Sequence, residues 1–116
     1  MAAPKPSILV QGTLDMLILK TLALEPMHGY GIGARIDQIS KGVFKVNAGS
    51  LFPAFRRLER DGLIEGEWEV TENNRRAKWY KITAQGRATL RRETKDWEIQ
   101  TAAIARILEA SLGELS

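Results

Sequence analysis

The sequence predicts an α+β protein that is mostly α with a small β-hairpin: a winged helix-turn-helix followed by a long C-terminal helix. Apolar residues recur at helical spacing in three segments before residue 61. From residue 64 the period changes to two over a pair of short segments, which predicts a hairpin. Residues 84–112 contain no proline and again follow a helical pattern. We therefore divide the 116 residues into a winged domain, 1–83, and a dimerisation helix, 84–116.

Two helices are expected in the first third of the chain. The first covers residues 13–24, with its leading threonine as N-cap and a Glu-Pro pair as its end. It is apolar on two sides, so it needs two packing partners: its own domain and the C-terminal helix of this chain or of a second copy. The second helix covers residues 29–40, and we expect Ile32, Ile36 and Ile39 to form its buried stripe.

A third helix is expected over about residues 47–60. Asn47 or Gly49 can cap its start, and an Asp-Gly pair ends it, with Gly62 as the left-handed residue. Pro53 should lie in or near the first turn, or the helix should bend there, because proline lacks the N–H that a helix interior uses. The residues expected to point inward are Leu51, Phe55 and Leu58.

The hairpin combines an acidic first strand with a basic loop and a basic second strand. The first strand begins near residue 64 and alternates apolar residues with three glutamates. A loop over residues 71–76 leads to the second strand, residues 77–82. Tyr80 and Ile82 should share the buried face of this strand. Lys81 should lie on the other face and pair with a glutamate of the first strand.

The C-terminal helix should extend beyond the domain that precedes it. Capped by Thr83, it covers residues 84–112 and is roughly 43 Å long at 1.5 Å per residue. A folded core of about 80 residues is only about 25 Å across. An overhanging amphipathic helix needs a partner in water, so we expect a homodimer. The expected dimer interface consists of Leu90, Trp97, Ile104 and Leu108.

Positive charge gathers at two places, although the net charge is only +3. Residues 73–82 hold four cations and no acid, and the third helix carries three arginines. In a winged helix such a helix enters the DNA major groove, and such a loop contacts phosphates or the minor groove. A solvated helix face and a polar turn are the structural alternatives. The candidate DNA-binding residues are Ser50, Phe52, Arg56, Arg57, Arg60, Arg75, Arg76 and Lys78.

The composition argues against several other classes of function. The chain has no cysteine, so neither disulfides nor thiolate chemistry are expected, which suits a reducing cytoplasm. A lone histidine makes no metal site, and no nucleophile–base pair, phosphate-binding loop or carboxylate pair points to an enzyme or a cofactor. No apolar run approaches the roughly 20 residues of a membrane span. The N-terminus is interpreted as a loosely ordered arm, not as a signal peptide.

Three single residues have two interpretations each. His28, the only histidine, stands at a helix start, where a structural or capping role is favoured over a chemical one. Tyr30 is interpreted as a core or inter-helix residue, with a phosphate contact from its hydroxyl as the alternative. Trp97 can pack at the dimer interface or stack on a planar ligand between subunits, and the two roles are compatible.

These residues resemble the PadR family of bacterial transcriptional regulators, over about residues 11–108. The resemblance implies a winged helix-turn-helix and a homodimer made by the C-terminal helix. It also implies repression at a palindromic operator, often released by a small phenolic or drug-like ligand. The single C-terminal helix is similar to the smaller subtype of the family. The matching residues are Gly12-Thr13-Leu14, His28-Gly29-Tyr30-Gly31-Ile32, Gly49-Ser50-Leu51-Phe52-Pro53-Ala54-Phe55-Arg56-Arg57-Leu58-Glu59, Asp61-Gly62-Leu63-Ile64, Arg75, Lys78, Tyr80, Thr83 and Gly86.

The chain departs from the family pattern at two places. Phe52 stands where the family usually has a tyrosine, so any contact made by that hydroxyl is absent here. The wing, usually Gly-Arg-Pro-Arg-Lys-Tyr-Tyr, is here Asn-Arg-Arg-Ala-Lys-Trp-Tyr over residues 74–80. We expect a cytoplasmic homodimeric repressor that binds double-stranded DNA and releases it with a small aromatic effector. The alternative is a winged-helix protein-interaction module without sequence-specific DNA binding.

Overall fold

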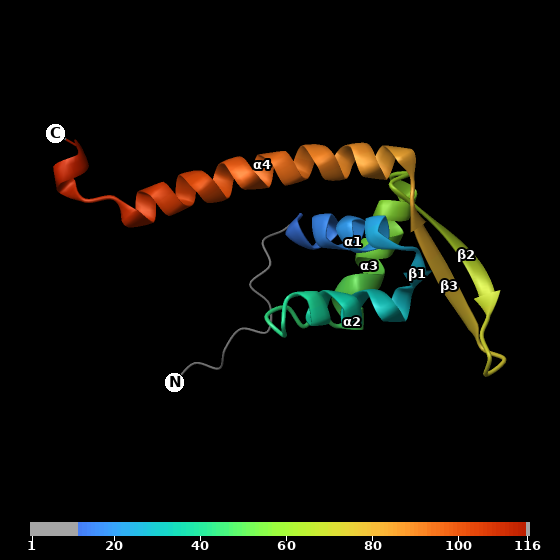
Figure 1. Cartoon of the computed structure of the whole chain (residues 1–116). Coiled ribbons are helices and arrows are strands. Elements are labelled where there is room, and N and C mark those ends of the chain that lie inside the picture. The colour runs from blue at the N-terminus through green and yellow to red at the C-terminus, as the bar shows by residue number, and fades with distance from the viewer. Residues whose placement is uncertain (1–11, 116) are drawn as a thin grey trace.

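The computed structural model describes residues 12–115, so the expected N-terminal arm lies outside the described residues. Three helices form a body from which a hairpin projects, and a fourth helix, α4 (Ala84–Glu109), runs along this body and far beyond it (Figure 1). This arrangement confirms the predicted α+β class. The elements are α1 (Thr13–Leu24), β1 (Met27–His28), α2 (Gly29–Ile39), α3 (Ala48–Arg60), β2 (Ile64–Val70), β3 (Arg76–Ile82), α4 (Ala84–Glu109) and the 3-10 helix η1 (Leu112–Leu115).

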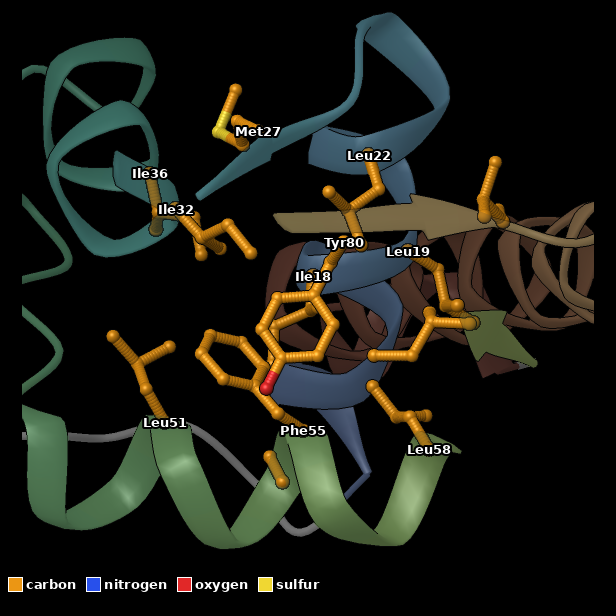
Figure 2. Packing of buried hydrophobic residues seen from close by; sticks show 13 residues of the cluster. Ile18, Leu19, Leu22, Met27, Ile32, Ile36, Leu51, Phe55, Leu58 and Tyr80 are labelled. Carbon is orange, nitrogen blue, oxygen red and sulfur yellow. The ribbon is translucent and has the colours of Figure 1, made fainter. Parts of the chain in front are cut away.

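The hydrophobic core lies where α1, α2, α3 and the sheet meet (Figure 2). Phe55 is fully buried in this core, and its ring centroid lies 4.9 Å from that of Tyr80 of β3. The three residues of α3 predicted to point inward are all buried, as are Tyr80 and Ile82 of the second hairpin strand. Within the described residues, no helix is both long enough and apolar enough to cross a membrane.

The prediction for α2 is wrong at its last turn. Ile32 and Ile36 are buried as expected, but Ile39 is 57% exposed. The helix ends at Ile39, where it reaches the rim of the body, and this side chain lines a shallow apolar groove with Leu17 and Phe44. A periodic stripe therefore stays buried only as far as a neighbouring element covers it.

Specific caps set the helix boundaries. Gly12, at φ 92°, is the N-cap of α1, so the predicted cap at Thr13 is off by one residue. Asn47 caps α3 and Thr83 caps α4, both as predicted. Gly62, at φ 75°, takes the left-handed conformation after α3, which favours glycine. The Thr83 hydroxyl also donates to the Gly62 carbonyl at 2.7 Å, and this bond ties the two junctions together.

The sheet has three antiparallel strands in the order β1-β3-β2, one more than the predicted hairpin. The strand that sequence analysis missed, β1, is only two residues long, and it pairs Met27 with Tyr80. The predicted Glu–Lys pairing is confirmed, because Glu65 lies opposite Lys81 with 3.4 Å between Oε2 and Nζ. β1 anchors the base of β3 to the helical body, while the tip of the hairpin projects freely (Figure 1).

The last long helix, α4, ends at Glu109, three residues before the predicted end. Its 26 residues span about 39 Å, and the chain measures 66 Å along its longest axis. The helix starts close to the body, since a Cβ on Gly86 would overlap the Leu63 carbonyl oxygen. Only its first half lies beside α1, and the second half extends past the helical body (Figure 1).

Candidate nucleic-acid interface

The polar side of α3 faces solvent because the four buried residues of the helix, all of them apolar, lie on its opposite side. Asn47 Oδ1 accepts the Ser50 N–H at 3.0 Å, which holds the first turn in place. Pro53 is the sixth residue of the helix, so it lies in the second turn rather than in the first. Of the predicted DNA-binding residues on α3, Phe52 is half-buried and the exposed ones are Ser50, Arg56, Arg57 and Arg60.

The three arginines of α3 differ in what holds them. Arg57 Nη2 lies 2.6 Å from Asp15 Oδ1 on α1, so this side chain leans back toward the body. Arg60 Nε lies 3.3 Å from its neighbour Asp61. Arg56 makes no ion pair with any of residues 12–115. Because exposed ion pairs contribute only about 0–1 kcal/mol, a phosphate can replace these carboxylates, but Arg56 is free without any exchange.

The tip of the hairpin is a tight turn that presents its arginines outward. Asn74 adopts a left-handed φ of 58°, and its N–H donates to the Thr71 carbonyl at 2.9 Å. The Thr71 N–H in turn donates to the Arg75 carbonyl at 2.7 Å. Asparagine tolerates this conformation better than most residues, which explains its position in the turn. Arg75 and Arg76 are exposed directly beyond it.

The inner face of the hairpin turns toward α3. The Arg76 guanidinium lies 5.1 Å from the ring centroid of Trp68, a cation–π contact. Lys78 Nζ lies 5.7 Å from the same ring and 2.8 Å from Glu59 Oε1. The ion pair between Lys78 and Glu59 therefore links the hairpin to α3, and Glu59 balances the charge of the lysine.

Between α2, α3 and the hairpin lies a hollow of about 230 Å³, which we call the wing crevice. An edge-to-face series of rings leads from its mouth into the core: Tyr30 to Phe52 at 5.7 Å, Phe52 to Phe55 at 5.4 Å, and Phe55 to Tyr80 at 4.9 Å with tilted planes. The side chains that line the crevice are Tyr30, Phe52, Arg56, Trp68, Arg76, Ala77, Lys78 and Tyr80.

Two acids in the structure hold their protons more tightly than usual. Burial raises the pKa of the Tyr80 phenol, and the nearby Lys78 charge partly offsets this effect. Burial also raises the pKa of the Glu93 carboxyl on α4, and the negative charge of Asp15 adds to the shift.

The comparisons with known proteins agree with this architecture. The model of the PadR-like transcriptional regulator family matches residues 18–92. The chain belongs to the PadR-like family. A transcriptional regulator from Mycobacterium tuberculosis is 32% identical to it over 81 residues, which cover 70% of this chain and 72% of that protein.

Solved structures of PadR-like and related regulators have the same fold. A transcriptional regulator from Clostridium thermocellum superimposes with a TM-score of 0.80 at 26% identity, over 89% of this chain and 100% of that one. A PadR family regulator from Eggerthella lenta gives 0.75 at 31% identity, over 87% and 86% of the two chains. The resemblance predicted from the sequence motifs is thus confirmed, and the protein is a transcriptional regulator of the PadR family.

The expected dimer interface of this PadR-like chain is divided between two environments. Leu90 is half-buried and packs against the core of its own chain. Trp97 is 41% exposed and lines an apolar groove of about 750 Å³ between α1 and α4, together with Met16 and Leu17. Farther along the helix, Ile104 and Leu108 are 52% and 80% exposed. Leu90 thus has an intrachain role, whereas the other three face outward.

The two remaining single-residue interpretations have different outcomes. Tyr30 is 76% exposed, so its interpretation as a core residue is wrong, although it does make an inter-helix ring contact. His28 is the N-cap of α2, but its side chain makes no capping hydrogen bond. Its ring stands edge-on to Trp79 at 4.7 Å and its Nε2 lies 4.0 Å from Glu69. His28 therefore packs against the two long strands of the hairpin.

Sequence analysis missed one aromatic residue and two acids at this interface. Trp68 was recognised only as part of the strand pattern, yet its ring holds Arg76. Asp15 and Glu59 pair with predicted DNA-binding residues that are 42 and 19 positions away in the sequence. A tryptophan facing a basic strand was the available signal for the first, whereas no local pattern reveals the two ion pairs.

Proposed function

We propose that this PadR-like protein is a homodimeric, cytoplasmic repressor that binds a palindromic operator through α3 and the hairpin wing. The observation that supports this most directly is the pair Arg56 and Arg76. Both are exposed, both are free of ion pairs within residues 12–115, and both line the same crevice from different elements. Arginines placed in this way can contact guanine edges and phosphates together.

The remaining predicted contacts extend this surface. Ser50 and the half-buried Phe52 stand at the N-terminal part of α3, the part of a recognition helix that meets base edges. Arg75 lies at the wing tip and suits the flanking backbone or the minor groove. Three further cations can contact DNA once a phosphate replaces the carboxylate that each now pairs with: Arg57, Arg60 and Lys78. If the dimer contacts about 6–10 phosphates, its affinity should fall about 10³- to 10⁵-fold between roughly 50 and 200 mM salt.

The dimer is proposed from the exposed apolar residues of α4. Trp97, Ile104 and Leu108 expose apolar surface on α4, and a second copy of the chain would remove this surface from water. Two-fold pairing would place two copies of α3 about one DNA turn, or a multiple of it, apart. Release by a small aromatic effector is proposed at Trp97, where the groove between α1 and α4 is apolar and open.

The test is selection of bound duplexes from a random DNA pool. Wild type would be run beside Arg56→Ala/Arg76→Ala and beside Arg87→Ala/Arg91→Ala, which removes the same charge from exposed positions on α4. We expect wild type and the α4 variant to enrich the same palindrome and the crevice variant to enrich none. Equal enrichment by all three would contradict the interface. No enrichment by a folded wild-type dimer would favour a protein-interaction module instead.

A further inference from the structure

Arg57 differs from its neighbour Arg60 in the acid that holds it. Its Nη2 lies 2.6 Å from Asp15 Oδ1 on α1, whereas Arg60 Nε lies 3.3 Å from Asp61. The Asp15 side chain is 21% exposed, against 52% for that of Asp61. The pair between Arg57 and Asp15 is therefore the shorter and the less solvated of the two, so water and salt screen it less.

Helix α1 presents the Asp15 carboxylate to α3. The residue stands in the first turn of α1, where the positive end of the helix dipole favours a negative charge. This helix packs against both α3 and α4, so its first turn lies within reach of Arg57, which is 42 positions away in the sequence. Asp15 thus offers Arg57 the kind of contact that a DNA phosphate would offer, an oxyanion within hydrogen-bond distance of a guanidinium.

The loss of Arg57 would leave Asp15 in an unfavourable environment. Burial raises the pKa of the Glu93 carboxyl on α4, and the negative charge of Asp15 raises it further. The two acids therefore repel each other when both are ionised, and the Arg57 guanidinium offsets the charge of Asp15. A partly buried carboxylate that loses its cation is destabilised, because its charge stays partly out of water. A phosphate that takes Arg57 from Asp15 must overcome this cost.

We propose that Asp15 sets the affinity of the protein for DNA, because it holds Arg57 as an intrachain substitute for a backbone phosphate. The proposal rests on the proposed DNA binding by α3. Arg57 should contribute little net affinity in the wild type, since its new contact to a phosphate replaces a contact to a carboxylate. Arg56 has no such cost, because it makes no ion pair with any of residues 12–115. Two adjacent exposed arginines would thus contribute unequally.

Titration of a fluorescent duplex of about 20 base pairs and arbitrary sequence, at about 50 mM salt, tests the proposal, because phosphate contacts need no operator. Asp15→Asn should tighten binding about three- to tenfold, since Arg57 is released and no charge is left behind. Asp15→Ala, which also removes the acceptor, should give at least the same gain. Urea midpoints show whether the variants are folded.

The matched control is Glu25→Gln, which also removes one carboxylate that pairs with an arginine. Glu25 Oε1 lies 2.8 Å from Arg35 Nη2, and neither residue belongs to the proposed DNA-binding set. This variant should change the affinity by less than about twofold, because the lost charge has only a screened effect on the interface. An equal gain for Glu25→Gln and Asp15→Asn would overturn the proposal, as would no gain for Asp15→Asn.

A double-mutant cycle shows whether the gain depends on Arg57. In an Arg57→Met background, Asp15→Asn should add no more affinity than Glu25→Gln does. Arg57→Met alone should weaken binding less than Arg56→Met, and the two should weaken it to a similar extent in the Asp15→Asn background. A gain that persists without Arg57 would contradict the proposal, since Asp15 would then act only through the net charge.

The salt dependence of binding is a measurement that a purely structural role of Asp15 would not change. In the wild type, the carboxylate that loses Arg57 attracts a cation from solution and so reduces the net release of ions. The slope of log affinity against log salt should therefore become steeper in Asp15→Asn, by up to about 0.9 for each Arg57 that contacts a phosphate. Tighter binding with an unchanged slope would count against the exchange.

Failure of the proposed sequence-specific function has a different result. The selection from random DNA would then enrich no palindrome, whereas the duplex of arbitrary sequence would still bind and its affinity would still show the effect of Asp15. A folded wild-type protein that binds no duplex at low salt would overturn both proposals.

Discussion

The helical body and the distal half of α4, residues 97–109, differ in how completely one chain buries them. In the body, Phe55, Ile18 and Ile32 have no exposed surface. In the distal half, Ile107 and Leu108 are 73% and 80% exposed. Both regions are regular helix, and both contain large aliphatic residues at helical spacing. The body buries its apolar residues against other parts of the same chain, whereas those of the distal half stay exposed in a single chain.

This difference separates two kinds of stability in one protein. The body should unfold as a unit whose free energy does not depend on concentration, because its contacts lie within one chain. The distal half should gain its stability from association, so its contribution should grow with protein concentration. A substitution in the body should therefore lower the free energy of unfolding at every protein concentration, whereas one in the distal half should mainly weaken self-association. The following predictions run from the largest expected effect to the smallest.

Phe55→Ala should lower the free energy of unfolding by about 3–5 kcal/mol, because it leaves a cavity where the core elements meet. Urea titration followed by circular dichroism measures the loss. Val43→Ala is the matched control, since Val43 is 74% exposed and its truncation should change stability by less than about 0.5 kcal/mol. Comparable losses for the two variants would show that the body is not the closed core described above.

Ile104→Asp should weaken self-association about a hundredfold or more, because pairing would bury an uncompensated carboxylate in each copy. Sedimentation velocity over a range of concentrations measures the effect. Ala88→Asp adds the same charge at an exposed position near the start of α4 and should leave association unchanged. A variant at Ile104 that sediments like wild type would remove the distal half from the dimer interface.

Gly86→Ala should destabilise the body by about 1–3 kcal/mol, because the added Cβ overlaps the Leu63 carbonyl and strain replaces a close contact. The urea midpoint should fall with little change in slope. Ala88→Ser, two residues along on an exposed position, is the control. An unchanged midpoint for Gly86→Ala would mean that α4 shifts easily at its root, and the two regions would then be less firmly joined.

Glu93→Gln should have a small effect that depends on pH. The folded-state pKa of Glu93 is raised, so the native state holds the proton more tightly than the unfolded chain. Its contribution to stability is therefore largest at low pH and is lost as pH rises from the ordinary glutamate value through the folded pKa. The variant should flatten this decline and raise the melting temperature slightly at neutral pH.

Melting curves recorded from about pH 4 to about pH 8 measure the change. Glu98→Gln, an exposed position on the same helix, serves as the control. If the two variants follow the same pH profile, the interaction of Glu93 with Asp15 across the α1–α4 junction does not contribute to stability.

Local sequence patterns predicted most of the helices and strands, because within one such element the buried and exposed positions alternate with a fixed period. The inward residues of α3 and the caps at Asn47 and Thr83 follow from helical spacing and hydrogen-bond chemistry within a few residues. The strand β1 was missed because two residues carry no periodicity, and only pairing with Tyr80 makes them a strand. The exposure of Ile39 was missed because helical spacing shows which face of α2 a residue lies on, but not whether a neighbouring element covers that face.

The candidate site was predicted in composition but not in its arrangement. The arginines of α3 and the wing could be identified as a basic surface from their positions in the sequence. The pairing of Arg57 with Asp15 could not, since the two are 42 residues apart. The approach of Arg76 to Trp68 depends on the register of β2 and β3. Such contacts are set by the folded geometry and leave no local signal.

Because α4 is one continuous helix that contacts the body at Gly86, it should rotate about that contact as a rigid unit. A rigid rod of about 39 Å converts a rotation of about 0.1 radian at its base into a displacement of about 4 Å at its tip. Small adjustments where the glycine meets the Leu63 carbonyl are thus amplified along the helix, and movements imposed at the far end are reduced at the body. The absence of a Cβ at Gly86 therefore determines how closely the start of α4 packs against the body.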